Sequence, residues 1–145
     1  MEIRIIGPKD IPDLIDMIRL FYEEDHRDFQ EGQIKRVLQE IILEESFGTI
    51  YMVSYDEKTA GYFILTFSWS LEYGGRNVFI DELYIKKNFR GLGLGKKSIE
   101  FVEQLAKDKK IKAIHLEVNK YNIAKKLYES KGYFSHNSDL MSKRF

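Results

Sequence analysis

Three glycines at alternate positions separate a strand-like segment from a helix-like segment in this 145-residue chain. The glycines belong to the run Arg90, Gly91, Leu92, Gly93, Leu94, Gly95 and Lys96. Residues 78–85, before the run, are rich in β-formers, and residues 96–109, after it, repeat apolar residues at helical spacing. Glycine permits positive φ and lets a ligand approach the backbone, while a helix N-terminus offers unpaired N–H groups. The sequence therefore predicts a strand, a phosphate-binding loop and a helix, in that order.

Two other kinds of phosphate-binding loop do not fit this run. A Walker A loop needs glycine where Arg90 stands and Ser or Thr where Lys97 stands. A dinucleotide-binding loop needs its third glycine one residue after Gly95, and it opens the first strand–helix unit of its domain, whereas this run lies past mid-chain. A glycine-rich connector that binds nothing remains an alternative.

The rest of the chain predicts an α/β protein. Strands are expected at 2–6, 49–55, 60–69, 78–85 and 111–118, helices at 10–24, 34–46, 96–109 and 122–131, and two last strands from Tyr133 and over Leu140 to Phe145. Such an order favours a mixed sheet with helices on its faces. With no internal repeat or linker, we expect one domain over residues 1–145.

Composition narrows the partners and the compartment. The 23 basic and 23 acidic residues balance, which gives no reason to expect a nucleic-acid or membrane partner. The N-terminus lacks a signal-peptide pattern, and no apolar run approaches the ~18 residues of a membrane helix, so we expect a cytoplasmic protein. Cysteine is absent and the three histidines, His26, His115 and His136, are scattered, so we predict no metal site.

The glycine run resembles the Arg/Gln-x-x-Gly-x-Gly/Ala signature of the GNAT superfamily of N-acetyltransferases. Arg90, Gly93 and Gly95 occupy its defining positions, residues 127–133 are also similar, and the element order agrees over essentially the whole chain. The resemblance, which is to small amine and polyamine acetyltransferases, implies the GNAT acyl-CoA N-acyltransferase fold. That fold has a mostly antiparallel sheet, a splayed parallel strand pair and about four helices.

The resemblance also implies acetyl-CoA as co-substrate. The amides of Arg90, Gly91, Leu92, Gly93, Leu94, Gly95 and Lys96 would hold its pyrophosphate, and Leu83, Tyr84 and Ile85 would pair with its pantetheine arm. Many family members carry an asparagine seven residues before the tyrosine that corresponds to Tyr128, but Tyr121 stands there in this chain. Asn119 and Asn122 are the candidates for that role, and helix capping by Asn122 is the alternative.

Acetyl transfer to an amine requires two proton movements. The amine, with a pKa near ~10.4, must lose a proton, and the departing thiolate, whose conjugate acid has a pKa near ~8.5, must gain one. Tyr128 resembles the tyrosine that GNAT enzymes place beside the CoA sulfur, which makes it the candidate acid. A buried core tyrosine is the alternative.

Asp81 and Glu82 interrupt an apolar strand, where carboxylates are costly unless exposed or used. Successive strand residues face opposite sides, so one of them is expected to face the acetyl group. Asp81 shares a face with Leu83 and is slightly preferred, while Glu82 shares a face with Tyr84. In similar polyamine-type enzymes an acidic residue here binds or deprotonates the amine. A solvated or structural pair is the alternative.

Three further residues are candidates for substrate contact. Trp69 and Glu72 lie in a turn with the composition of a lid over a cation, and Tyr22 ends the first helix. We therefore predict an N-acetyltransferase that moves acetyl from acetyl-CoA to a primary amine of a small cationic molecule in a ternary complex. The alternatives are a non-catalytic acyl-CoA sensor, a scaffold that binds no CoA, and an enzyme for protein N-termini or lysines. A homodimer is compatible with the resemblance.

Overall fold

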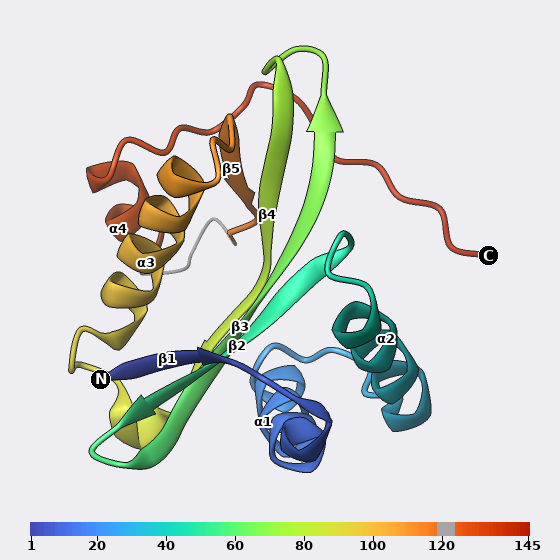
Figure 1. The fold of residues 1–145 in the computed structure, drawn as a ribbon, viewed down its shortest axis with the longest axis vertical. Coiled ribbons are helices and arrows are strands. Elements are labelled where there is room, and N and C mark those ends of the chain that lie inside the picture. The colour runs from blue at the N-terminus through green and yellow to red at the C-terminus, as the bar shows by residue number, and fades with distance from the viewer. Residues whose placement is uncertain (119–123) are drawn as a thin grey trace.

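The computed structural model describes residues 1–118 and 124–145 and shows a five-stranded sheet covered by helices on both faces (Figure 1). Its strands, in spatial order, are β1 (Glu2–Ile5), β2 (Gly48–Tyr55), β3 (Lys58–Ser70), β4 (Gly75–Ile85) and β5 (Ala113–Leu116). The first four pair antiparallel and β5 pairs parallel to β4. The helices are α1 (Ile11–Glu24), α2 (Glu31–Leu43), α3 (Leu94–Asp108) and α4 (Ala124–Ser130). This confirms the predicted mixed sheet with about four helices.

Two apolar cores lie on the two faces of the sheet. Helices α1 and α2 cover one face, where Leu14 and Leu38 pack near Met52 of β2. Helix α3 covers the other face, where Ile99 packs near Val53 of β2. Neighbouring residues of β2 thus belong to different cores, because side chains alternate along a strand. The burial of both faces explains why the central strands read as nearly continuous apolar runs.

A β-bulge at Asp81 changes the phase of β4. Ile80 lies opposite Leu65 of β3 and Glu82 lies opposite Ile64, so Asp81 is an extra residue with no partner on β3. In a regular strand Ile80 and Glu82 would share a face. Because of the bulge, Ile80 packs in the α3 core, while Glu82 reaches tyrosines on the α1 face. The bulge thus delivers the carboxylate of Glu82 to the α1 face.

The parallel strands β4 and β5 pair over a short distance only. Asn77 to Ile80 of β4 match Ala113 to Leu116 of β5, and the pairing ends there. Within residues 1–118 and 124–145, no strand pairs with that edge of β4 from 81 to 85. This is the splayed pair that the resemblance implied, although β5 is shorter than the predicted strand 111–118.

The predicted strands from Tyr133 and over Leu140 to Phe145 are wrong. Residues 131–145 form no strand in the structure, and the segment runs past the tip of the β3–β4 hairpin to the opposite side of the molecule (Figure 1). Leu140, Met141 and Phe145 are exposed, so no packing surface supports them. A segment of high strand propensity forms a strand only where a partner strand is available, and no described strand pairs with residues 131–145.

Gly61 of β3, opposite the end of β4, has no room for a side chain. A Cβ atom at this position would overlap the carbonyl oxygen of Tyr84, which lies on the paired strand. We therefore expect Gly61→Ala to lower the free energy of unfolding by about 2 kcal/mol or more, because a backbone atom must move. Gly32→Ala is the control, since no atom lies within 4 Å of its Cβ position. There we expect a gain of about 0.5–1 kcal/mol in helix α2. Urea denaturation measures both, and equal stability of the two variants would contradict this account.

Candidate active site

The glycine loop leads from β4 into α3 through a 3-10 turn (Lys87–Phe89). Gly91 has φ 81° and Gly93 has φ 74°, in the left-handed region that favours glycine. Gly93 is the N-cap of α3, so the helix begins at Leu94, two residues before the predicted start. A Cβ atom at Gly91, Gly93 or Gly95 would meet no atom within 4 Å. The surface of the loop is therefore open to a ligand.

The first turn of α3 has the character of an anion site. The N–H of Lys97 donates to the carbonyl of Gly93 at 3.0 Å, so the N–H groups of Leu94, Gly95 and Lys96 come before the regular bonding of the helix. The positive end of the helix dipole adds to these donors. The side chain of Leu94 is buried, whereas Leu92 and Lys96 are exposed at the rim. Main-chain N–H groups at a helix N-terminus are donors suited to a phosphate group.

Arg90 does not project freely from this loop. Its Nε donates to the carbonyl oxygen of Ile85 at 2.8 Å, and its Nη2 donates to Oε2 of Glu24 at 2.7 Å. The guanidinium also lies 5.6 Å from the centre of the Tyr84 ring. The structure therefore places the charge of Arg90 at the junction of α1 and β4, in an ion pair with Glu24.

The carboxylate of Glu24 also contacts Tyr84 and Lys87. The hydroxyl of Tyr84 donates to Oε1 at 3.0 Å, and Nζ of Lys87 lies 3.9 Å from the same oxygen. Burial would raise the pKa of Glu24, but the hydrogen bonds from Arg90 and Tyr84 outweigh it and hold the pKa below its usual value. Burial and the bond to Glu24 raise the pKa of Tyr84 to about 12. At neutral pH Glu24 is thus ionised and Tyr84 keeps its proton.

Glu82 is a buried carboxylate held by two tyrosines. Tyr22 donates to Oε1 at 2.9 Å and Tyr62 donates to Oε2 at 2.7 Å, while only 7% of Glu82 is exposed. Burial raises the pKa of Glu82, and the two hydrogen bonds only partly oppose this. Burial and the charge of Glu82 raise the pKa of Tyr22 to about 12, and the pKa of Tyr62 rises for the same reasons. The protons therefore stay on the tyrosines, and Glu82 is the acceptor.

Asp81 presents a second carboxylate beside Glu82. The residue is exposed as a whole, but the surrounding protein partly removes its carboxyl group from water. This desolvation raises the pKa of Asp81, and the positive charge of Arg27 opposes the rise only in part. The guanidinium of Arg27 lies over the rings of Phe21 and Tyr22, at 5.2 Å and 5.6 Å from their centres. Two adjacent carboxyl groups with raised pKa values thus occupy the bulge of β4.

Tyr128 lies on the other face of the sheet. Its ring packs edge-on against Tyr133 at 5.8 Å, on the border of the α3 core, and burial raises its pKa. Tyr128 lines a cavity of about 720 Å³ between β5, α3, α4 and residues 132–136. Leu116 and Val118 line the same cavity, at the point where β4 and β5 part. The structure therefore brings Tyr128 to the splayed edge, on the opposite face from Glu82.

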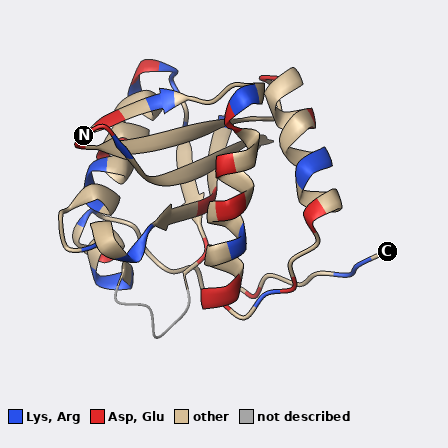
Figure 2. Cartoon of the chain, turned by 90° about the horizontal axis from the view of Figure 1, so that it is seen from below, with Lys and Arg blue, Asp and Glu red and all other residues tan. Residues whose placement is uncertain are grey.

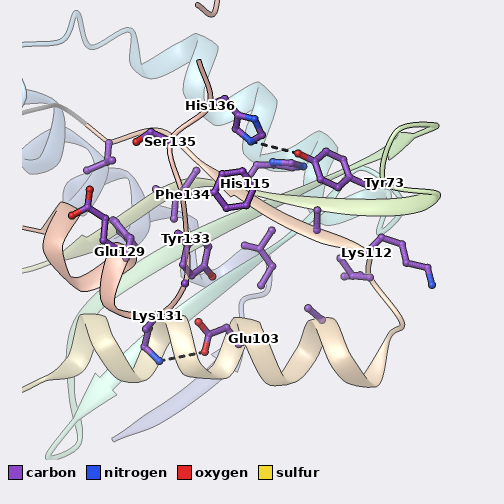
Figure 3. A pocket seen from close by; sticks show the side chains of 18 of the residues that line it. Tyr73, Glu103, Lys112, His115, Glu129, Lys131, Tyr133, Phe134, Ser135 and His136 are labelled. Carbon is purple, nitrogen blue, oxygen red and sulfur yellow. Dashed lines mark hydrogen bonds and ion pairs between the residues drawn. The ribbon is translucent and has the colours of Figure 1, made fainter. Parts of the chain in front are cut away.

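The far end of this cavity is aromatic (Figure 3). A hydrogen bond of 3.4 Å joins the hydroxyl of Tyr73 to Nε2 of His136, and the ring of His115 lies 5.1 Å from that of Tyr73. At the other end, Nζ of Lys131 lies 3.3 Å from Oε2 of Glu103. Among residues 1–118 and 124–145, no group of three or more His, Cys, Asp or Glu side chains is arranged to hold a metal ion.

The remaining candidates divide into two groups. Tyr22 contacts Glu82 directly, but Trp69 and Glu72 lie at the exposed tip of the β3–β4 hairpin. Trp69 is five residues along β3 from Ile64, the partner of Glu82, which corresponds to about 17 Å. The structure thus does not bring the predicted lid to Glu82. Asn119 and Asn122 lie outside the described residues.

Sequence reasoning missed Tyr62 and the pairing of Glu24 with Arg90. Tyr62 lies in an apolar strand, where its ring reads as an ordinary β-former, and its partner Glu82 is 20 positions away. Glu24 ends a helix among other acidic residues, and its partner Arg90 is 66 positions away. No local pattern reports such pairs. A carboxylate inside an apolar strand was the one available signal, since it needs buried donors.

Comparison with known proteins identifies the family. The sequence model of the Acetyltransferase (GNAT) family matches residues 12–133, so the chain belongs to this family. A thialysine N-epsilon-acetyltransferase of Bos taurus is 37% identical over 73 residues, which are 50% of this chain and 42% of that protein. The chain thus matches less than half of this relative's length.

Two further likenesses extend over most of the chain. An uncharacterized N-acetyltransferase of Lactobacillus delbrueckii subsp. lactis is 27% identical over 139 residues, which cover 88% of this chain and 80% of that protein. The crystal structure of an integron cassette protein from the mobile metagenome of Cole Harbour Salt Marsh superposes with a TM-score of 0.86 at 25% identity. That superposition covers 98% of this chain and 89% of the other. Both likenesses agree with membership of the acetyltransferase (GNAT) family.

None of the helices in the described residues combines the length and the apolar character needed to cross a bilayer. Basic and acidic segments are interleaved along the helices (Figure 2), in keeping with the balanced composition.

Proposed function

We propose that this protein transfers an acetyl group from acetyl-CoA to a primary amine of a small cationic molecule. The observation that carries the proposal is the edge of β4 at residues 81–85, with which no strand of the described residues pairs. The N-terminus of α3 lies beyond one end of this edge, and the carboxylates of Asp81 and Glu82 lie at the other end. The name of the bovine relative specifies transfer to an ε-nitrogen of an amino-acid-like substrate, which supports an amine acceptor.

The chain's own groups would hold acetyl-CoA at two places. The main-chain N–H groups of Leu94, Gly95 and Lys96 suit the diphosphate, because they are unpaired and lie at the positive end of a helix. The edge of β4 beyond Ile80, with which no described strand pairs, suits the amide groups of the pantetheine arm, although the carbonyl oxygen of Ile85 already accepts from Arg90. Bound there, acetyl-CoA supplies an activated thioester.

Glu82 would act as the general base and Asp81 would attract the substrate ammonium. The raised pKa of Glu82 makes it a better proton acceptor at neutral pH than an ordinary glutamate, and Tyr22 and Tyr62 fix the orientation of its oxygens. Asp81 is the exposed member of the pair, so it meets the cation first. Tyr128 keeps its proton at neutral pH and would donate it to the departing sulfur.

Two measurements on the full chain test this function. Calorimetric titration with acetyl-CoA should show binding, and the absence of heat would favour a scaffold. A thiol-release assay with polyamines, thialysine, lysine and peptides with free N-termini should show release with a small cationic amine. Binding without release by any amine would favour an acyl-CoA sensor, and release with peptides alone would favour a protein acetyltransferase.

Tyr128→Phe should lower kcat by about 10- to 100-fold, because the variant keeps the ring but cannot donate the proton. The Kd for acetyl-CoA, measured by calorimetry, should change less than about twofold, because the packing of the ring against Tyr133 is retained. Tyr133→Phe is the matched control, since Tyr133 lines the same cavity. Equal losses of kcat in both variants would contradict the role of Tyr128.

A further inference from the structure

We propose that Glu24 is a positioning residue for acetyl-CoA binding: it holds Arg90 on the carbonyl oxygen of Ile85 and so fixes the glycine loop against the end of β4. This inference rests on the proposed function, because it concerns the residues that would hold acetyl-CoA. Neither the family signature nor the sequence indicates that the last residue of α1 pairs with Arg90.

The geometry of Arg90 joins three parts of the chain. Arg90 follows the 3-10 turn, Ile85 is the last residue of β4, and Glu24 is the last residue of α1. Two different nitrogens of one guanidinium bind the other two residues, at 2.8 Å and 2.7 Å. Charge-assisted bonds of this length are among the stronger hydrogen bonds in proteins. A single side chain thus sets the position of the loop relative to both elements.

Glu24 is itself held on both of its oxygens. Oε2 accepts from Arg90 and Oε1 accepts from the hydroxyl of Tyr84. Tyr84 lies between Leu83 and Ile85, in the part of β4 that is expected to meet the pantetheine arm. Rotation of the Glu24 carboxylate would break a bond on each side, so it keeps the guanidinium in one place. The last turn of α1 therefore supports both halves of the proposed acetyl-CoA site.

The loop needs such an anchor because its next residues are glycines. Gly91 and Gly93 both have positive φ, and open space lies where their Cβ atoms would be. Glycine loses more conformational freedom on ordering than any other residue. Arg90 is the last side chain with a tertiary contact before this pair, and the next buried side chain is Leu94 at the start of α3. The path of the loop between these two points therefore depends on where Arg90 is fixed.

Two roles for Arg90 predict opposite results. If Arg90 were a ligand of the diphosphate, Glu24 would compete for its charge, and removing that charge would strengthen acetyl-CoA binding. If Arg90 instead fixes the position of the loop, as its two hydrogen bonds indicate, removing the charge of Glu24 frees the guanidinium and weakens acetyl-CoA binding. The sign of the effect therefore decides between them.

The experiment measures acetyl-CoA affinity by calorimetry in the full chain. We expect Glu24→Gln to raise the Kd for acetyl-CoA about tenfold, as befits the loss of a charge-assisted hydrogen bond. The KM for acetyl-CoA should rise in parallel, while the KM for the amine should change little. Glu23→Gln is the matched control, an exposed neighbour on the same turn, and its Kd should stay within about twofold.

A double variant tests whether the two residues act as one unit. Glu24→Gln combined with Arg90→Gln should bind no more weakly than Arg90→Gln alone, because the second change removes a contact already lost. Arg90→Lys keeps the charge but cannot bind both partners, so it should also weaken binding, and it provides a second test if Glu24→Gln folds poorly. Thermal melting checks the fold of each variant.

The outcomes separate this inference from the proposed function. If the parent chain binds acetyl-CoA and Glu24→Gln binds equally or more tightly, the positioning role is overturned and the function stands. Unchanged affinity in Arg90→Lys would overturn it as well. If the parent chain binds no acetyl-CoA, both proposals fall.

Discussion

Glu82→Gln is expected to lower kcat for acetyl transfer by about 10²- to 10³-fold, because glutamine keeps the shape of the side chain but cannot accept a proton. The amide can still bond to both tyrosine hydroxyls, with one of them now accepting instead of donating. The local packing should therefore survive. Thiol release at saturating acetyl-CoA and amine measures the loss, and circular dichroism confirms the fold.

The pH dependence of kcat gives an independent check on Glu82. A general base acts in its ionised form, so kcat should fall as the pH drops through the pKa of this carboxyl group. Burial raises that pKa, so the fall should begin at a higher pH than for an ordinary glutamate. In Glu82→Gln this acid limb should disappear from the residual activity. An acid limb that persists unchanged in the variant would assign the titration to another group.

Asp81→Asn is the matched control at the adjacent position. Asp81 is exposed and would act on the substrate cation before the reaction, so the variant should raise the KM for the amine more than it lowers kcat. The opposite result, a large loss of kcat in Asp81→Asn and near-normal kcat in Glu82→Gln, would exchange the two roles.

The second large effect is expected at Gly95. Gly95→Leu should raise the Kd for acetyl-CoA by at least about 100-fold, because the new side chain would stand among the N–H groups that would hold the diphosphate. The fold should not suffer. No atom lies within 4 Å of the Cβ position, the φ of Gly95 is not positive, and leucine is a good helix former.

Gly95→Ala separates steric blocking from a change in the helix. The family signature admits alanine here, so this variant should bind acetyl-CoA within about threefold of the parent. Both variants should melt at or above the temperature of the parent chain, since each replaces a glycine in a helix. Normal acetyl-CoA binding by Gly95→Leu would show that the diphosphate does not lie on this helix end, and most of the proposed site would fall with it.

The glycine loop shows what local sequence can predict. A strand, three spaced glycines and an amphipathic helix appear in the structure in the predicted order, because each depends on neighbours within a few residues. Gly91 and Gly93 do adopt the positive φ that made them informative. The same local logic failed from Tyr133 onward, where the residues suit a strand but no strand of the described residues pairs with them.

The roles of Glu82 and Arg90 depended on tertiary structure. Strict alternation would leave Glu82 on the face of Ile80, and only the bulge opposite Ile64 and Leu65 of β3 moves it to the face of Tyr22. Arg90 matched the family signature, yet its charge is taken by Glu24, 66 positions earlier.

The sequence by itself thus determined the helices, the central strands and the glycine loop, since local periodicity and backbone freedom encode them. Tertiary structure decided the phase of β4 and the partners of its charged residues. The physical reason is that a bulge depends on how two strands fit together. An ion pair, likewise, depends on which distant residues the packing brings within reach.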